Sequence, residues 1–227
     1  MRFLTIFSDC ISMHTIFRFL TISLCDPSLG KVDKASFSQQ TLMEFFIEGI
    51  TNAEVICDTA NGYPGILPWK NVQLDEQGLV YTIDWEKFNL QGTINPQWLP
   101  DTLKTLNLDQ NSLKGTLDFT QLPEDLEELC LSSNAFSGTI SLESLPDALT
   151  IIDVTANKLH GSLDLTKLPK SLEYIFADEN SFSGTLDFTR LPPRILSVHL
   201  GDNQFEGETD FSQLPDSLRH IDIENNN

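Results

Sequence analysis

The chain has 227 residues, of which 40% are hydrophobic and 21% are charged, so length and composition predict one folded domain with a sizeable core and exclude disorder. Its formal net charge is −19 with only 14 Lys and Arg residues, which argues against nucleic-acid binding, because phosphate recognition draws on clustered basic side chains. A partner that is steered by charge should be basic or cationic.

Residues 1–30 form the first predicted element, a signal or targeting segment. Asp9 and Arg18 interrupt its apolar stretches, so none approaches the roughly 18 residues of a membrane-spanning helix. Read from Met13, the segment has a basic start, a short apolar run and small residues at signal-cleavage spacing before Lys31. These features predict a secretory signal, and a frayed or wrongly assigned start is the alternative.

Residues 31–75 are predicted to form an N-terminal cap. Ser36 and Gln39 have the spacing of a capping box. Apolar residues then recur at helical intervals, at Leu42, Phe45, Phe46 and Ile50. An amphipathic helix of about three turns would close the N-terminal end of the core.

Residues 76–227 contain a repeat with a period of 23 residues, which is strict from LPDTLKTLNLDQNSLKGTLDFTQ at Leu99 onward. Five complete units precede a truncated sixth, and residues 76–98 keep the register in degraded form, with Phe88 where the later units have asparagine. Such self-similarity predicts a solenoid, whose units bury their apolar faces only by stacking. The alternation of Leu106 and Leu108 predicts a short strand in each unit, and successive strands should pair in parallel.

Three columns of polar or small residues repeat at the same period. An asparagine ends each strand and should build a ladder that bonds the turn backbones, because its amide both donates and accepts. A glycine four residues later permits a tight bend, and an aspartate beyond it is typical of a capped turn rather than of a metal site. The asparagines are Asn111, Asn134, Asn157, Asn180, Asn203 and Asn226, the glycines are Gly115, Gly138, Gly161, Gly184 and Gly207, and the aspartates are Asp118, Asp164, Asp187 and Asp210.

The units match LxxLxLxxNxFxGxL, and on these residues the chain resembles leucine-rich repeat proteins of the plant type and is similar to surface-antigen-like repeat proteins of protozoa. The resemblance implies an α/β-type repeat solenoid, a right-handed superhelix with a parallel concave β-sheet and an N-terminal helical cap. It also implies protein or peptide binding on the concave face. Cys57 and Trp69 occupy places like those of the plant-type cap, but the second cap cysteine is missing near Gln73, which puts the cap disulfide in doubt.

In this fold the outward residues of the main strands line the concave face, and the repeat register assigns them. They are Thr82, Asp84, Glu86, Thr105, Asn107, Asp109, Glu128, Cys130, Ser132, Ile151, Asp153, Thr155, Tyr174, Phe176, Asp178, Ser197, His199, Gly201, His220, Asp222 and Glu224.

The candidate ligand-binding site lies around two aromatic residues of this face. Tyr174 and Phe176, flanked by Ile151 and His199, resemble binding hot spots, which are rich in aromatics. Acidic residues of the same face would speed the encounter with a basic partner; those nearest are Glu128, Asp153 and Asp178. The alternatives are ordinary variation of a tolerant surface and solvated charge that keeps the protein soluble.

No catalytic, cofactor or metal site is predicted. His199, His220 and Asp222 should lie on adjacent strands, but a zinc or catalytic role needs a further ligand and a pocket, and the sheet is open. The cysteines lack the spacing of zinc sites or redox dithiols and are expected to be mostly unpaired thiols: Cys10, Cys25, Cys57 and Cys130. The sequence has no glycine-rich phosphate loop, HExxH, GxSxG or kinase element.

The chain stops directly after its last core strand, and three interpretations stay open: a fragment of a longer product, a dimer that joins open ends, or a short protein that tolerates the open end. We expect a protein- or peptide-binding module, secreted or at the cell surface, that takes a basic partner and no nucleic acid. The alternatives are a structural, self-associating coat protein and a cytosolic adaptor.

Overall fold

The computed structural model describes residues 34–57, 65 and 69–227. The chain divides into two compact units, Met1–Phe37 and Ser38–Asn227. In the first unit the described residues include a short 3-10 helix, η1 (Lys34–Ser36), and the predicted signal segment lies outside the described residues. Over the described ranges, no helix combines the length and apolar character needed to cross a bilayer.

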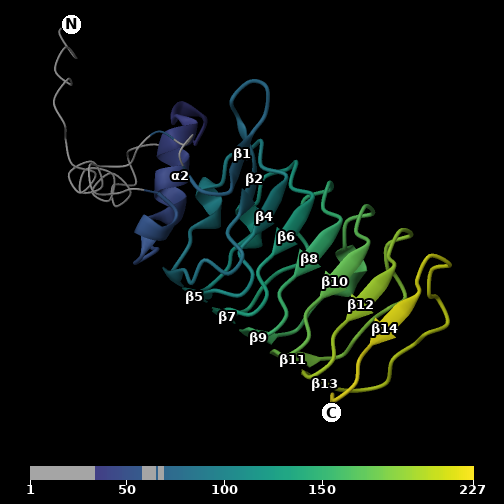
Figure 1. Cartoon of the computed structure of the whole chain (residues 1–227). Helices are drawn as coiled ribbons and strands as arrows, with labels where there is room; N and C mark the ends of the chain where they lie inside the picture. The colour runs from purple at the N-terminus through teal and green to yellow at the C-terminus, as the bar shows by residue number, and fades with distance from the viewer. Residues whose placement is uncertain (1–33, 58–64, 66–68) are drawn as a thin grey trace, which may run out of the picture. The chain divides into compact units, whose positions relative to one another are not determined.

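The second unit begins with helix α2 (Gln39–Ile47), drawn in dark blue in Figure 1. Its N-cap is Ser38, whose Oγ accepts a hydrogen bond from the backbone N–H three residues later at 3.2 Å. The predicted capping box of Ser36 and Gln39 is therefore wrong. The Gln39 side chain instead bonds backbone atoms of Gly78 and Val80 at 3.0 and 2.6 Å, and so ties the helix to the first repeat.

One face of α2 closes the N-terminal end of the core, as predicted. Its buried residues are Leu42, Met43, Phe45, Phe46 and Ile47. Phe46 stacks on Trp85 of the first repeat with ring centroids 6.0 Å apart. Ile50, predicted as part of the helix, lies beyond its end and forms an antiparallel bridge with Gly92. A 3-10 helix, η2 (Ala53–Val55), follows.

The main strands form an eight-stranded sheet in chain order (Figure 1). It contains β1 (Val72–Leu74), β2 (Val80–Asp84), β4 (Thr105–Asn107), β6 (Glu128–Cys130), β8 (Ile151–Asp153), β10 (Tyr174–Phe176), β12 (Ser197–His199) and β14 (His220–Asp222). β1 is antiparallel to β2, and every later pair is parallel, with each residue opposite the one 23 positions further along, as Thr105 is opposite Glu128. The repeat period therefore becomes the sheet register.

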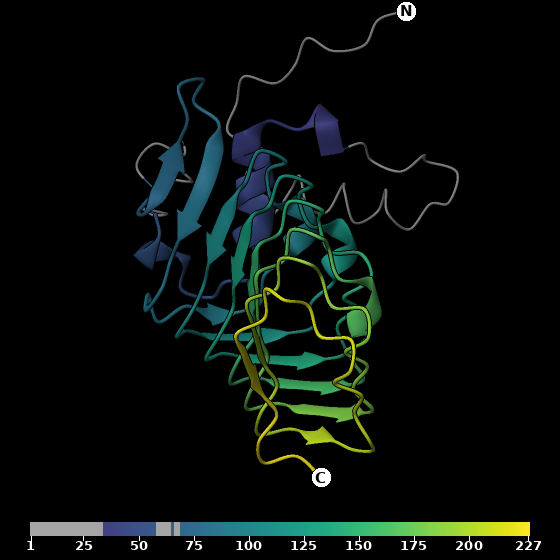
Figure 2. The same cartoon turned by 90° about the vertical axis from the view of Figure 1, so that its right-hand side faces the viewer.

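The second short strands form a six-stranded sheet on the other side of the repeats (Figure 2). Its strands are β3 (Gln91–Gly92), β5 (Ser112–Gly115), β7 (Ala135–Gly138), β9 (Lys158–Gly161), β11 (Ser181–Gly184) and β13 (Gln204–Phe205). Three 3-10 helices follow some of these strands: η3 (Pro96–Trp98), η4 (Phe119–Gln121) and η5 (Leu165–Lys167). The repeated leucines and phenylalanines fill the space between the sheets; Ile152 and Phe182, for example, are at most 1% exposed.

The asparagine column forms the predicted ladder. Asn157 Oδ1 accepts a hydrogen bond from Phe136 N at 3.0 Å, and its Nδ2 donates to Leu131 O, also at 3.0 Å, in the preceding repeat. The same Nδ2 lies 3.1 Å from two carbonyl oxygens of its own turn, those of Val154 and Thr155. Each asparagine thus bonds two neighbouring repeats. In the first repeat, where Phe88 replaces it, Asn52 of the cap bonds the backbone of Asn89 and Gln91 at 2.9 and 2.8 Å.

The other two columns also have the predicted roles. Gly161 has a φ of +91°, in the left-handed region that glycine adopts without strain. Asp164 caps η5, because its Oδ1 accepts a hydrogen bond from Thr166 N at 2.9 Å. The hydrogen bond from the Thr166 hydroxyl, and then this backbone bond, lower the pKa of the Asp164 carboxyl. Equivalent bonds at Asp118, Asp187 and Asp210 confirm a structural role for the column.

Candidate ligand-binding face

The structure places the predicted outward residues on one face of the eight-stranded sheet, which we call the concave face. In strands such as β10 the central residue is buried and the two flanking residues are partly exposed. Ser197 and Gly201 are exceptions, because these small residues are covered by their larger neighbours and are buried. The register therefore predicts which residues belong to the face, and side-chain size decides which of them reach the surface.

Four rings form a continuous aromatic run on this face: Tyr174, Phe176, His199 and His220. Tyr174 and Phe176 stack with centroids 6.0 Å apart and an interplanar angle of 16°. Phe176 lies 4.9 Å from His199, and His199 lies 4.7 Å from His220. The run crosses three adjacent strands, β10, β12 and β14, and offers a half-exposed surface for apolar contact.

The other predicted site residues surround one end of this run. Ile151 is opposite Tyr174 in the sheet, and Asp153 is opposite Phe176. Glu128 lies one strand further away, opposite Ile151. The structure thus brings together the residues that the sequence analysis selected, although their role in binding stays a prediction.

Asp178 is a carboxylate near the run that also bonds the backbone of the next repeat. Its Oδ1 accepts a hydrogen bond from Gly201 N at 2.8 Å. Burial raises the pKa of the Asp178 carboxyl, while this hydrogen bond and the nearby His199 oppose the shift. The residue therefore anchors the backbone of the next strand as well as contributing negative charge to the face.

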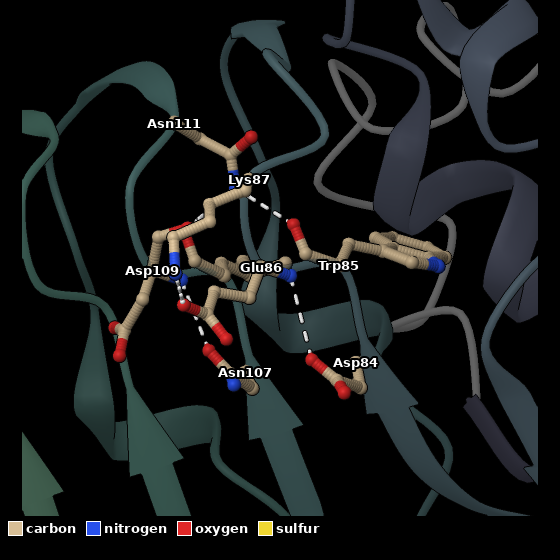
Figure 3. A network of polar contacts seen from close by, with 8 residues as sticks. Asp84, Trp85, Glu86, Lys87, Asn107, Asp109 and Asn111 are labelled. Carbon is tan, nitrogen blue, oxygen red and sulfur yellow. Dashed lines mark hydrogen bonds and ion pairs between the residues drawn. The ribbon is translucent and has the colours of Figure 1, made fainter.

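The N-terminal part of the face has a different chemistry (Figure 3). Its outward residues bond one another: Asn107 Oδ1 accepts from Asp109 N at 3.0 Å, and Glu86 pairs with Lys87 at 2.5 Å. Asp84 Oδ1 lies 3.4 Å from Glu86 N. The outward residues of β2 and β4 are polar, and local contacts engage several of their side chains.

Cys130 lies on the same face between these two regions. Burial, together with the charges of Asp109, Asp153 and Glu128, raises the pKa of its thiol to about 12. A thiol in such surroundings is a poor nucleophile at neutral pH. Cys57, in the cap, is 3% exposed and its Sγ lies 3.7 Å from Ala53 O.

His199, His220 and Asp222 lie close together on adjacent strands, as the sequence predicted. One ligand atom from each residue can be chosen so that all three lie within 4.8 Å of one another. His199 is directly opposite Asp222 in the parallel register, and His220 is opposite Ser197. The sequence predicted no metal role for these residues.

An open depression of about 550 Å³ lies at the N-terminal end of the sheet, away from the aromatic run. It is lined by Leu74, Asp75, Glu76, Tyr81, Thr102, Lys104 and Asp125. The repeat pattern of the sequence does not predict this depression, because it lies where the irregular β1 meets the first regular units. Its lining combines carboxylates with one lysine and offers no convergent set of catalytic groups.

Comparison with known proteins supports the fold. No protein-family model and no curated protein sequence matches the chain. Among solved structures, a pollen receptor kinase 3 has a TM-score of 0.62 and 26% identity, over 82% of this chain and 93% of that one. The leucine-rich repeat ectodomain of the Arabidopsis receptor kinase HAESA, in complex with an IDA peptide hormone, has a TM-score of 0.66 and 23% identity, over 83% of this chain and 33% of that one.

The ectodomain of the receptor kinase SOBIR1 from Arabidopsis thaliana has a TM-score of 0.51 and 24% identity, over 82% of this chain and 97% of that one. Together with the 23-residue register and the asparagine ladder, these similarities define the class. The chain is a leucine-rich repeat protein with the solenoid fold of plant receptor ectodomains. It spans about a third of the HAESA ectodomain, at 33% coverage, and nearly all of the pollen receptor kinase structure, at 93%.

Proposed function

We propose that this protein is a peptide- or protein-binding module that holds its ligand on the C-terminal part of the concave face, across β8 to β14. The aromatic run is the observation that carries the proposal. Aromatic side chains supply large contact area at low entropic cost, and they are enriched where truncation weakens binding most. Tyr174 and Phe176 are the expected anchors, with Ile151 extending the apolar surface.

Charge supports a basic ligand. Three aspartates lie beside the aromatic run: Asp222 is on β14, Asp178 follows β10, and Asp153 is on the adjacent β8. The whole chain has a net charge of −19. Complementary charge speeds encounter and selects among partners more than it adds affinity. We therefore expect association to slow as salt is added, with a smaller effect on dissociation.

The structural relatives support a recognition role by analogy. The HAESA structure contains a peptide hormone bound to a leucine-rich repeat ectodomain. Fold carries function only by analogy, so the site itself must be tested. By the same analogy we place the protein outside the cell or at its surface, with residues 1–30 as a signal segment, 31–75 as the cap and 76–227 as the recognition repeats. The proposal assigns the protein no catalytic activity.

The test begins with selection of peptides from a displayed random library on the full chain. Binding of a selected peptide is then measured for the wild type, for Tyr174→Ala/Phe176→Ala and for Thr105→Ala/Asn107→Ala. The control pair occupies the same two columns on β4. We expect the aromatic pair to lose at least roughly 30-fold in affinity and the control pair to change little. Equal affinities for all three proteins would remove the aromatic run from the proposal, and selection of acidic peptides would contradict the role of charge.

Self-association stays a prediction with one observation in its favour. Phe211 is 47% exposed and Leu214 is 36% exposed, and both lie near β14 at the edge of the sheet. Sedimentation velocity over a range of concentrations measures it directly. Dimers that disappear on Phe211→Ser would support contact at this end, and a monomer at every concentration would exclude it.

A further inference from the structure

Two histidines and one carboxylate meet on the concave face at the β14 end of the aromatic run, within the peptide site proposed above. Ligand atoms of His199, His220 and Asp222 all lie within 4.8 Å of one another. The geometry points to a binding site for a divalent first-row transition-metal ion, Zn²⁺ above all, with these three side chains as ligands.

The parallel register creates this arrangement. Asp222 is opposite His199 on the neighbouring strand, and His220 lies on the same strand as Asp222, two residues earlier. The side chains therefore share one side of the sheet, because side chains alternate along a strand. Tetrahedral zinc with bonds of about 2.0–2.1 Å needs its ligand atoms about 3.3 Å apart. Rotation of side chains that are half-buried or exposed can close the remaining gap without moving the backbone.

The donor set selects the kind of ion. Imidazole nitrogens suit Zn²⁺, Cu²⁺ and Ni²⁺, whereas Mg²⁺ and Ca²⁺ prefer sites built from oxygen. Two histidines and a carboxylate form one of the sets that hold zinc in sites with an open coordination position. Because the sheet is open to solvent, that position would face a bound ligand or water. The missing pocket therefore does not exclude metal binding; it makes the fourth ligand exchangeable.

Neighbouring groups already orient two of the three ligands. Ser197 Oγ lies 2.9 Å from Nε2 of His199, a contact of the kind that fixes the ring of a ligating histidine. Asp222 Oδ1 accepts a hydrogen bond from Glu224 N at 2.9 Å, which leaves its second carboxylate oxygen outside that bond.

Gly201 has no side chain, and two carboxylates lie next to its Cα. A Cβ atom at this position would lie 3.2 Å from Oδ1 of Asp178 and 3.2 Å from Oδ1 of Asp222. Two carboxylates therefore converge where the column has no side chain, and their charge favours a cation beside the histidines. Asp178 thus contributes to the field around the site without being one of its three ligands.

The competing explanation is ring packing alone, since His199 also contacts Phe176. The variant His199→Phe distinguishes metal binding from ring packing, because it keeps an aromatic ring and removes both nitrogens. Asp222→Asn removes the carboxylate charge and is matched by Asp153→Asn in the same column, two strands away from β12. His160→Ala controls for histidine content, since His160 is exposed on β9 of the other sheet.

The experiment is calorimetric titration of the full chain with ZnCl₂ alone. We expect one saturable site in the wild type, His160→Ala and Asp153→Asn proteins, and a loss of at least about 10-fold in affinity in His199→Phe, His220→Ala and Asp222→Asn. Circular dichroism melts verify that each variant is folded. Unchanged affinity in His199→Phe or His220→Ala would overturn the site. Loss in those two with no change in Asp222→Asn would overturn the three-ligand arrangement. Because the probe is the metal alone, either result leaves the peptide-binding proposal standing.

Discussion

The turns of the solenoid are uniform from repeat to repeat, whereas the concave face varies. We call the turns, with their ladder asparagines, glycines and capping aspartates, the turn side. On the turn side every regular repeat has the same asparagine and glycine, and all but one, which has Ser141, have the capping aspartate. Asn111 and Asn226 make the same ladder bonds at opposite ends of the row. On the concave face the backbone is equally regular, but the outward residues change from polar groups on β4 to aromatic groups on β10 and β12. The turn side therefore specifies the fold, and the face is the part that can vary without disturbing it.

The ladder should show the largest effect of any substitution in this comparison. Asn157→Ala removes several hydrogen bonds and leaves backbone groups of two repeats unsatisfied, so we expect a loss of about 3 kcal/mol in unfolding free energy. Asn107→Ala on the face removes one local bond and should cost below about 1 kcal/mol. Urea denaturation measures both. Equal losses of unfolding free energy in the two variants would mean that the ladder does not make the turn side more important for stability than the concave face.

Glycines offer a second test of the same contrast. Gly161 has a φ of +91°, and an added Cβ would lie 2.9 Å from Cγ2 of Thr139, so Gly161→Ala should cost about 2 kcal/mol. Gly201 lies outside the left-handed region, and an added Cβ would meet its nearest neighbours at 3.2 and 3.3 Å, so Gly201→Ala on the face should cost at most about 1 kcal/mol. Thermal melts of the two variants measure the difference, and a reversed order would show that the face is the more rigid region.

Carboxylates on the two sides should respond to pH in opposite directions. On the face, burial raises the pKa of Asp109; on the turn side, bonds from Thr189 lower the pKa of Asp187. A raised pKa means that stability is present below the unfolded value, near 4, and is lost as pH rises through the folded value. A lowered pKa means that stability is present above the unfolded value and is lost as pH falls.

At neutral pH, Asp109→Asn should therefore melt above the wild type and Asp187→Asn below it. The Asp109 difference should shrink as the pH falls through the raised folded pKa toward about 4, and the Asp187 difference should shrink as the pH falls below about 4 toward the lowered folded pKa. Melting temperatures between pH 3 and pH 7, a range set around the unfolded Asp value of about 3.9, test this. Parallel curves for the three proteins would contradict the assigned shifts.

The smallest expected effect is a slow rate of alkylation at the Cys130 thiol, a property that does not bear on fold or binding. With its pKa raised to about 12, the thiolate is scarce at neutral pH. Partial compensation by greater nucleophilicity leaves alkylation roughly 40-fold slower than for an ordinary cysteine. Peptide mass spectrometry after iodoacetamide treatment measures the rate at this residue. An alkylation rate equal to that in the urea-unfolded chain would show that the acidic face does not lower the reactivity of the Cys130 thiol.

Sequence reasoning succeeded where the period carries the information. The register, both sheets, the asparagine ladder and the capped turns follow from a 23-residue spacing in which each residue type has one physical role. It failed at the cap, which occurs once: Ser38 rather than Ser36 caps α2, and Asn52 bonds the backbone of Asn89 and Gln91, next to the position where Phe88 replaces the ladder asparagine.

Two other features depend on geometry that residue types do not reveal. The residue before each ladder asparagine has a left-handed φ, 53° at Ala156 and 54° at Gln110, although these positions hold no glycine. The ladder bonds hold that conformation, so no local propensity signals it. Likewise, the approach of His199, His220 and Asp222 depends on side-chain directions across two strands. The sequence placed them on neighbouring strands but could not measure their separation.

Photo-crosslinking to a selected peptide tests most directly whether the aromatic part of the concave face holds the ligand. A benzoylphenylalanine replaces either Phe176 or Asn107, which occupy the same column on β10 and β4. We predict that the peptide crosslinks efficiently from position 176 and little from position 107. Equal crosslinking from both positions, or crosslinking from position 107 alone, would contradict the division of the face into a binding part and a part that only completes the scaffold.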